Sequence, residues 1–346
     1  MHRRKEERGA ALLTVLLMVA IISVLAATAL EKLRLSTRIA GNAAATEQAR
    51  AYAMAAETLA IVRIDGLLQQ ATDRVTLAGG WSGHPFSLPL PGGIATARVT
   101  DGGNCLNLNG LVTQATPTIT TGVAGAAPAV AATTPYVAAP ARVAEFARLI
   151  RLQGTPGQLA AAIADATADW IDSDAAELPD GAEDGRYADG AQPYRTANTL
   201  MADPSELRAV AGVTPAIYAS LRPFLCTLPM ARPSTLNVDT LLPEQAPLVA
   251  MLAPDTVGIG QAQAALVARP PQGFASAGDF WSQGPLATAA AGDAPGRTGV
   301  LSRWFALEID VTVGVGGGST HLKEHALVDA THLPPRLVSR QWGEDL

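Results

Sequence analysis

Residues 1–30 read MHRRKEERGAALLTVLLMVAIISVLAATAL and decide the class of protein. Within them, residues 10–30 carry no charged side chain, and a helix of this length would be about 31 Å long, close to the thickness of a bilayer's hydrocarbon core. Four basic residues precede this stretch: Arg3, Arg4, Lys5 and Arg8. The positive-inside rule therefore predicts a single-pass anchor with a cytoplasmic amino terminus and the bulk of the chain across the membrane. In a cell with two membranes this corresponds to an inner-membrane anchor with a periplasmic bulk.

The helical pattern does not stop at the membrane. Glu31 and Lys32 follow directly, whereas a cleaved secretory signal would need a shorter apolar core followed by a cut. Residues 31–70 contain no proline, and apolar residues recur at three-, four- or seven-residue spacing between charged ones. The resulting stripe is Leu30, Leu33, Ala40, Ala44, Ala51, Ala55, Leu59 and Val62. We expect one helix over residues 10–70, with its first half in lipid and its second half amphipathic.

A basic leader that ends in Gly9, before a charge-free helix that becomes amphipathic, resembles the class III signal of type IV pilins and pseudopilins. The resemblance implies cleavage between Gly9 and Ala10 by a prepilin peptidase, and methylation of the new terminus. Most members begin with Phe or Met and carry Glu at the fifth mature position, where this chain has Ala10 and Thr14. A carboxylate in lipid is costly unless paired, and in pilins that Glu is thought to pair with a neighbouring subunit's terminal amine. Its absence characterises the K-type pseudopilin.

The charge composition bears on whether the chain binds nucleic acid. The chain has 346 residues, 25 Lys and Arg against 31 Asp and Glu, and a formal net charge of −6. A weakly acidic chain has no general electrostatic footprint for nucleic acid, so we expect no nucleic-acid partner. Glycine turns near residues 210–213 and 257–260 vaguely resemble helix-hairpin-helix units, but residues 241–281 contain one basic residue, Arg269. We interpret these turns as packing motifs.

The order of elements predicts an α+β fold. Strands are expected at residues 86–90, 94–101 and 105–108, and again at 304–313, 320–330 and 336–342. Helical patterns fill 141–152, 155–171, 204–211, 215–225 and 243–281. We therefore expect a pseudopilin sheet interrupted by a large helical subdomain. The predicted parts are a leader (1–9), a long helix (10–70), the first part of the sheet domain (81–112), a flexible Ala/Thr/Pro-rich insert (113–141), an inserted helical domain (142–232), and a second helical zone with the remaining strands (233–346).

Four blocks in this order resemble the general secretion pathway protein K family. They are NCLNLNGL (104–111), WIDSDAAELPDGAEDGRY (170–187), PYRTANTLMADPSELRAVAGV (193–213) and, after LRPFLCTLP, TLNVDT (235–240). The resemblance implies a non-enzymatic minor pseudopilin at the tip of the type II secretion pseudopilus, which supports the start of pseudopilus assembly and protein secretion. Its expected partners are the other minor pseudopilins, the major pseudopilin and the prepilin peptidase. The alternatives are a minor pilin of a type IV pilus and a single-pass anchored periplasmic metal-dependent enzyme.

Carboxylates crowd into residues 165–190 together with three glycines. Hard oxygen ligands on a flexible loop suit Ca²⁺, although the spacing is not that of an EF-hand, and a solvated acidic loop is the alternative. The family resemblance implies structural calcium in the helical subdomain. The candidate ligands are Asp172, Asp174, Glu183 and Asp184, with Asn198 and Asp203 as weaker candidates.

Two further motifs bear on chemistry. HLKEH (321–325) fits an inverted zinc-protease pattern, but GVGGGST before it and LVDATHLPP after it favour a strand, in which Glu324 points away from both histidines.

Cys105 and Cys226 are too few for a disulfide scaffold and too far apart for a CxxC motif. Because both lie on the predicted periplasmic side, beside segments that resemble strands of one sheet (NCLNLN and TLNVDT), we expect a disulfide. Two buried free thiols are the alternative.

Overall fold

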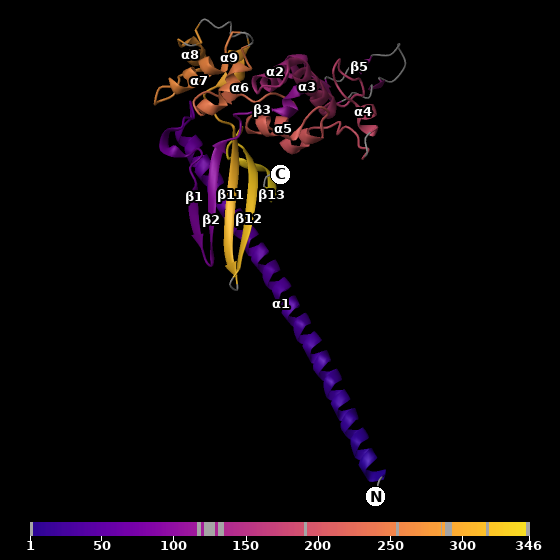
Figure 1. The fold of residues 1–346 in the computed structure, drawn as a ribbon. Helices are drawn as coiled ribbons and strands as arrows, with labels where there is room; N and C mark the ends of the chain where they lie inside the picture. The colour runs from indigo at the N-terminus through magenta and orange to yellow at the C-terminus, as the bar shows by residue number, and fades with distance from the viewer. Residues whose placement is uncertain are drawn as a thin grey trace.

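The computed structural model describes residues 3–115, 119–120, 129–130, 135–189, 192–253, 256–284, 286–287, 293–315 and 318–343. It has three parts (Figure 1). The stem is the helix α1 (Arg3–Gln70), the sheet subdomain is one antiparallel sheet against the end of that helix, and the helical head lies beyond the end of the sheet that is remote from the stem.

The stem is one unbroken helix of 68 residues. It starts at Arg3, so the backbone stays helical through the predicted cleavage point at Gly9–Ala10, a longer helix than the sequence predicts. Large apolar side chains of the first half, such as Leu13 and Met18, are exposed. Among the described residues this is the one helix whose length and composition would allow it to cross a membrane.

The sheet subdomain has five strands in the order β1-β2-β11-β12-β13. Their bounds are β1 Phe86–Leu90, β2 Gly93–Asp101, β11 Trp304–Val315, β12 Gly318–Asp329 and β13 Arg336–Trp342. All neighbouring pairs are antiparallel, and β11 lies between β2 and β12 although more than 200 residues separate it from β2 along the chain. The predicted α+β fold and the strands on both sides of the helical insertion are confirmed.

The end of α1 packs across one face of this sheet. Its buried side chains are mostly alanines at three- and four-residue spacing: Ala45, Ala49, Ala53, Ala56, Ala60 and Ile64. They meet apolar strand residues including Ile309 and Phe305. Small side chains let the helix approach the sheet closely, and long strand side chains fill the gap. Most of the predicted stripe lies on the other side, where Ala51, Ala55 and Val62 are exposed.

The helical head is built from short elements. Its helices are α2 Pro140–Leu152, α3 Gly157–Ile171, α4 Asp184–Ala188, α5 Pro215–Leu221, α6 Ala246–Ala250, α7 Ile259–Val267, α8 Ala277–Ser282 and α9 Ala294–Arg297. One hydrophobic core joins them and runs from Leu106 to Ala294. The two helical zones predicted on either side of residue 232 therefore share one core, and the head extends past that boundary.

Small differences from the predicted elements have local causes. The insert predicted over residues 113–141 has ordered ends, since β4 (Val112–Gln114) pairs with β7 (Tyr136–Ala138), and β5 (Ile119–Thr120) pairs with β6 (Ala129–Val130); the rest lies outside the described residues. The helix expected at 204–211 is a 3₁₀ helix, Pro204–Ala209.

TLNVDT does not pair with NCLNLN. Its strand β9 (Leu236–Asn237) pairs with β10 (Thr298–Gly299), whereas β3 (Leu106–Asn107) pairs with β8 (Leu225–Cys226). The expectation of one shared sheet for these two segments was wrong, because strands of two residues take whichever neighbour the head's core brings beside them.

Candidate metal centre

The candidate site is a loop between two helices of the head. Helix α3 ends at Ile171 with Asp172 as its C-cap, and Glu183 is the N-cap of α4. The loop between them returns the chain so that both caps face each other. The acidic block predicted from the sequence is thus folded around two helix ends.

Three of the predicted ligands come together there. One carboxylate oxygen from each of Asp172, Asp174 and Glu183 lies within 4.8 Å of the others. Asp172 is 2% exposed, and its Oδ1 has no hydrogen-bond partner; Glu183 Oε1 is likewise buried without one. Among the described residues no Lys, Arg or His forms an ion pair with this trio. Buried carboxylate oxygens without a donor or a cation are costly, so this trio is a candidate site for a positively charged ligand.

Asp169 and Gly181 hold the loop in shape. The buried Asp169 carboxylate accepts hydrogen bonds from the backbone N–H groups of Ala182 (2.8 Å) and Leu178 (3.3 Å). A Cβ at Gly181 would lie 1.9 Å from Asp169 Oδ2, so only glycine allows this approach. Sequence reasoning did not single out Asp169. Its place on the last turn of α3, three residues before Asp172, was the available signal.

The local electrostatics follow from burial and mutual repulsion. Burial, with the charges of Asp174 and other carboxylates, raises the pKa of Asp172 to about 7. Burial and Asp169 raise the pKa of Glu183 to about 7, and burial raises the pKa of Asp169 to about 6 despite its backbone hydrogen bonds. A cation at the centre of the trio would favour the ionised form of each.

The donor set fits a hard divalent cation. Three carboxylates offer up to six oxygens, and Ca²⁺ takes six to eight oxygen ligands in flexible geometry. Among the described residues no His or Cys belongs to the group, so the soft and borderline ligands preferred by zinc and copper are not part of it. Asp172, Asp174 and Glu183 are the residues that would hold the ion, with water or backbone carbonyls completing the shell.

The other predicted ligands have different partners. Asp184 accepts hydrogen bonds from the Thr196 N–H and hydroxyl, which lower its pKa, and lies 3.9 Å from Arg195. Asp203 caps the 3₁₀ helix by accepting from the Ser205 N–H. Asn198 has a positive φ of 48°, and its N–H donates to the Trp170 carbonyl oxygen beside the loop. The structure thus leaves Asp184 and Asp203 outside the trio and Asn198 near it.

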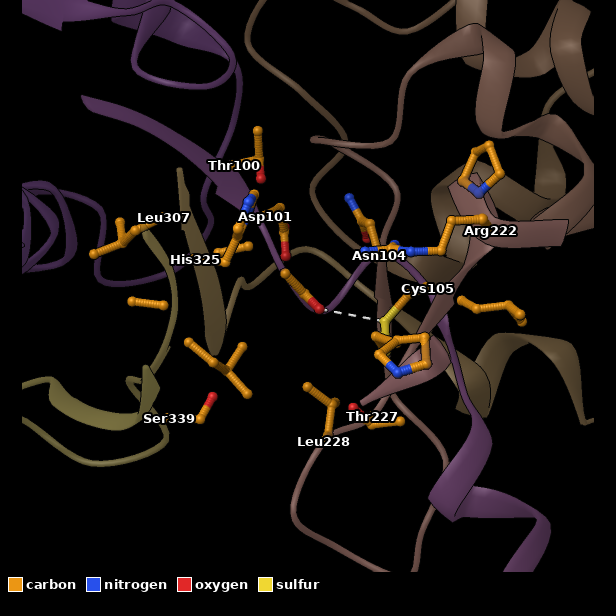
Figure 2. A pocket seen from close by; sticks show the side chains of 18 of the residues that line it. Thr100, Asp101, Asn104, Cys105, Arg222, Thr227, Leu228, Leu307, His325 and Ser339 are labelled. Carbon is orange, nitrogen blue, oxygen red and sulfur yellow. Dashed lines mark hydrogen bonds between the residues drawn. A yellow bond between two sulfur atoms is a disulfide. The ribbon is translucent and has the colours of Figure 1, made fainter. Parts of the chain in front are cut away.

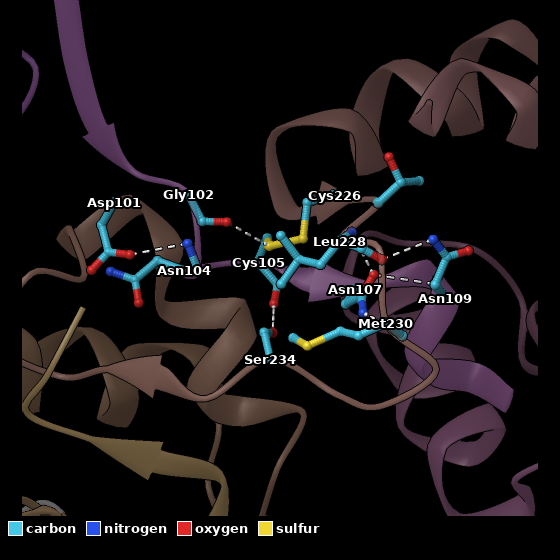
Figure 3. Close-up of a disulfide and its surroundings, with 12 residues drawn as sticks. Asp101, Gly102, Asn104, Cys105, Asn107, Asn109, Cys226, Leu228, Met230 and Ser234 are labelled. Carbon is cyan, nitrogen blue, oxygen red and sulfur yellow. Dashed lines mark hydrogen bonds between the residues drawn. A yellow bond between two sulfur atoms is a disulfide. The ribbon is translucent and has the colours of Figure 1, made fainter. Parts of the chain in front are cut away.

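The neck between sheet and head is a second feature built by the family's sequence blocks. Cys105 and Cys226 form a disulfide with Cα atoms 5.8 Å apart (Figure 3). The asparagines of NCLNLN satisfy backbone groups around it. Asn107 Nδ2 donates to the carbonyl oxygens of Met230 and Arg232, and Asn109 Nδ2 donates to those of Met201 and Leu228. These amides fasten the start of the inserted head to segments about 90 to 125 residues further along.

A pocket of about 410 Å³ lies beside the neck, between the outer face of the sheet and the head (Figure 2). Thr100, His325 and Ser339 reach it from the sheet side, and Cys105, Arg222 and Thr227 from the head side. Asp101 also lines the pocket. Its carboxylate accepts from the hydroxyls of Thr240 and Ser302, and burial raises its pKa. The pocket therefore lies where segments of the sheet and of the head meet, beside the disulfide.

HLKEH forms part of strand β12, as predicted. His321 and His325 lie on the outer face of the sheet, whereas Glu324 is fully buried toward α1. The two histidines and the glutamate therefore cannot share one ion, and the zinc-protease geometry is not formed.

A membrane-length helix whose end packs on an antiparallel sheet defines a class of protein: the pilin-like, membrane-anchored filament subunit. The comparisons with known proteins agree. Models of the type II secretion system protein K family match residues 104–230 and 236–300. Proteins called type II secretion system protein K are similar over nearly the whole length: that of Pectobacterium carotovorum is 32% identical over 98% of both chains, and that of Aeromonas hydrophila is 32% identical over 90% of both chains.

A solved structure supports the same assignment. GspK in the GspK-GspI-GspJ complex of enterotoxigenic Escherichia coli is 28% identical, with a TM-score of 0.70 over 87% of this chain and 97% of that one. The chain belongs to the type II secretion system protein K family and is a minor pseudopilin of that system. The family is a structural component of the secretion machine.

Proposed function

We propose that this subunit caps the periplasmic pseudopilus at its tip and supports the start of its assembly. The observation that carries the proposal is the size and position of the helical head, which covers the end of the sheet opposite the stem (Figure 1). A subunit stacked above would have to occupy the space that the head fills. Thr14 supports the same position, because this chain has no carboxylate there to pair with the amine of a subunit above.

The stem supplies the expected face for neighbours below. Its exposed side carries small and apolar residues, including Ala51, Met54, Ala55 and Val62, beside the buried side that packs on the sheet. Small residues allow close helix–helix approach. The similar GspK was solved with GspI and GspJ, which supports the other minor pseudopilins as partners here. The major pseudopilin would follow further down the filament.

Site-specific crosslinking in cells tests the position. Photo-crosslinkers at Ala51 and Ala55 should capture other pseudopilins, whereas crosslinkers on the exposed head, for example at Leu159, should capture no pseudopilin. Repeated copies of this chain along the shaft, with pseudopilins crosslinked to the head, would refute the tip position while leaving the family assignment intact. Thr14→Glu tests the electrostatic part, since a tip subunit gains no partner from the added carboxylate and secretion should not improve.

We also propose that the trio Asp172, Asp174 and Glu183 binds a structural calcium ion. Support comes from the buried oxygens without hydrogen-bond partners and from the carboxylate-only donor set. The ion would fix the ends of α3 and α4 relative to each other. A ligand that binds only the folded state raises its stability by mass action, about 2.7 kcal/mol at one hundred times the dissociation constant.

Thermal unfolding of the full-length chain in detergent tests this proposal. Calcium should raise the melting temperature of the head, and a chelator should reverse the effect. The double substitution Asp174→Ala with Glu183→Ala should abolish the response, whereas Asp189→Ala, an exposed acidic residue outside the trio, should retain it. A melting curve that ignores both calcium and chelator would leave the loop a solvated acidic surface.

Processing by a prepilin peptidase completes the proposal. The basic leader ending in Gly9 supports cleavage before Ala10 and methylation of the new amino terminus. Intact-mass analysis of membrane-extracted protein should show a methylated Ala10. An unprocessed chain recovered from cells with an active prepilin peptidase would contradict it.

A further inference from the structure

Two glutamates and one arginine form a buried cluster where the stem meets the sheet. Glu57 comes from α1, Glu324 from β12 and Arg340 from β13. Glu324 is fully buried and Glu57 is 5% exposed. The cluster lies apart from the metal centre and the neck, and neither the proposed docking face nor the calcium proposal uses it.

Arg340 donates its hydrogen bonds to one of the two carboxyl groups, that of Glu57. Arg340 Nε and Nη2 each donate to Glu57 at 2.8 Å, which is a bidentate pair. Its Nε also lies 3.4 Å from Glu324 Oε1, outside hydrogen-bond geometry, and neither Glu324 oxygen has a hydrogen-bond donor among the described residues. Both carboxyl groups therefore lie against the same guanidinium nitrogen, Arg340 Nε.

Among the described residues, no cation other than Arg340 forms an ion pair with either carboxyl group. Ile309 lies opposite Glu324 on β11 and Trp342 lies opposite it on β13. On α1, the alanines one turn before and after Glu57, Ala53 and Ala60, are buried. On β12 itself, Lys323 and His325 point to the outer face. Lys323 is 3.9 Å from Asp310 there. One positive charge thus faces two buried carboxylates, and an unpaired buried carboxylate is far more costly than a protonated one.

We propose that Glu324 retains a proton in the folded protein and donates it to Glu57 in a hydrogen bond, so that the cluster is a proton-dependent tie holding the edge strand β13 to the stem helix. The shared proton makes the cluster neutral: one guanidinium, one carboxylate and one carboxylic acid. When the proton leaves, a net negative charge stays buried between α1, β12 and β13. Strand β13 is the element free to move in response, because it is an edge strand with pairing on one side.

The direction of the pH effect follows from linkage. Burial and the neighbouring Glu57 raise the pKa of Glu324 from 4.5 to about 8, while Arg340 counteracts burial and lowers the pKa of Glu57. Below about pH 4.5 Glu324 is protonated in both the folded and the unfolded chain. Between there and about pH 8 only the folded chain keeps the proton, so its stability falls as pH rises through that window. The contribution of the Glu324 proton to the tie is therefore greatest near pH 4.5 and is lost as pH rises past about 8.

Infrared titration of the full-length protein in detergent tests the proton directly. The difference between the parent and Glu324→Gln spectra separates this group from the head carboxyls Asp172 and Glu183, whose pKa values burial raises to about 7. In that difference, the C=O stretch of a protonated carboxyl group should persist through neutral pH and disappear near pH 8. A signal lost entirely in the ordinary carboxyl range near 4.5 would overturn the proposal. In Glu57→Gln the remaining carboxylate can pair with Arg340, so the neutral-pH signal should also vanish; this second variant keeps the test valid should Glu324→Gln fail to fold.

Hydrogen exchange tests the mechanical part. After correction for the intrinsic rates, the β13 amides should exchange roughly fiftyfold faster at about pH 8 than near pH 6, because opening coupled to the loss of one proton speeds by about tenfold per pH unit within the window between the two pKa values. Glu324→Gln should remove most of this change. Glu308→Gln on the outer face, where Glu308 pairs with Arg98 at 2.9 Å, is the matched control and should retain it. Equal pH dependence in the parent and in Glu324→Gln would refute the tie.

Discussion

Carboxylates are buried in both the sheet subdomain and the helical head, but the two regions compensate them differently. In the sheet subdomain Glu57 and Glu324 share Arg340, which donates two hydrogen bonds from β13. In the head, Asp172, Asp174 and Glu183 have no ion-pair partner among the described residues. An internal cation makes the first cluster a structural tie. The lack of one makes the second a candidate binding site.

The two clusters also differ in what the chain does around them. The sheet cluster joins three elements that are distant in sequence, because Glu57 and Arg340 are 283 residues apart. The metal trio is local, within residues 172–183, and the backbone N–H groups bonded to Asp169 shape its loop. A distant cluster stabilises tertiary structure, whereas a local loop can order around an ion without disturbing the rest.

The largest expected effect on the free energy of unfolding comes from removing the disulfide, which lies between the sheet subdomain and the helical head. The disulfide closes a loop with a sequence separation of 121 residues, and the loop contains the whole metal trio. Replacing Cys105 and Cys226 together by serine should lower the free energy of unfolding by about 4.7 kcal/mol, the loop-entropy value for a closed loop of roughly 100 residues. Hydrogen exchange should show loss of protection in α3 and retention in β12.

Equal loss of hydrogen-exchange protection in both regions would mean that the sheet subdomain and the helical head unfold as one unit. The two regions would then differ in how they compensate buried carboxylates, but not in how they unfold. Unchanged stability after both cysteines are replaced would contradict a structural role for the disulfide. Reducing the unmodified protein with dithiothreitol is the control, and should reproduce the effect of the substitutions.

Removing the positive charge of Arg340 should leave the Glu57–Glu324 cluster without a charge partner, as the carboxylates of the helical head are. Arg340→Gln leaves two buried carboxylates without a charge partner, and breaking such a pair costs about 3 kcal/mol. The loss should be greater at pH 8 than at pH 5, because the carboxylates can take up protons in acid. Urea unfolding at both pH values measures it. Arg336→Gln, an exposed position on the same strand, is the control and should change little.

How far the sequence predicts these two regions depends on distance along the chain. The stem, the strands and the acidic loop are visible because their signals are local: an uncharged run, alternation, and carboxylates near one another. Glu57 and Arg340 give no such signal, since no local pattern relates two residues on opposite sides of an inserted head. Asp184 and Asp203 share the composition of the acidic blocks, but hydrogen bonds to Thr196 and Ser205 decide their orientation.

The hydrophobic core of the helical head is another feature that local sequence patterns do not fully predict. Apolar periodicity predicts the helices before and after residue 232, but it does not say that both groups pack on one core from Leu106 to Ala294. Likewise, the side of α1 that meets the sheet could not be chosen from composition, because alanines lie all around the helix. Ala49 and Ala53 face the sheet, whereas Ala51 and Ala55 face away. The choice depends on the strands that pack there.

The smallest expected effect on stability, that of Asp174→Asn, distinguishes most clearly between a metal-binding site and a structural ion-pair cluster. Without metal, the trio's carboxylates repel each other, and Asp174 contributes to the raised pKa of Asp172. Asp174→Asn should therefore stabilise the metal-free protein by about 1 kcal/mol, the Coulomb energy of two charges near 4 Å in a highly polar medium, while it reduces the gain from calcium. Differential scanning calorimetry with chelator and then with calcium measures both. Asp189→Asn is the matched control and should alter neither. In the sheet cluster the corresponding loss of a charged partner, Arg340→Gln, destabilises under every condition. If Asp174→Asn also destabilised the metal-free protein, Asp174 would be part of the fold's own support, and the distinction between the two clusters would fail.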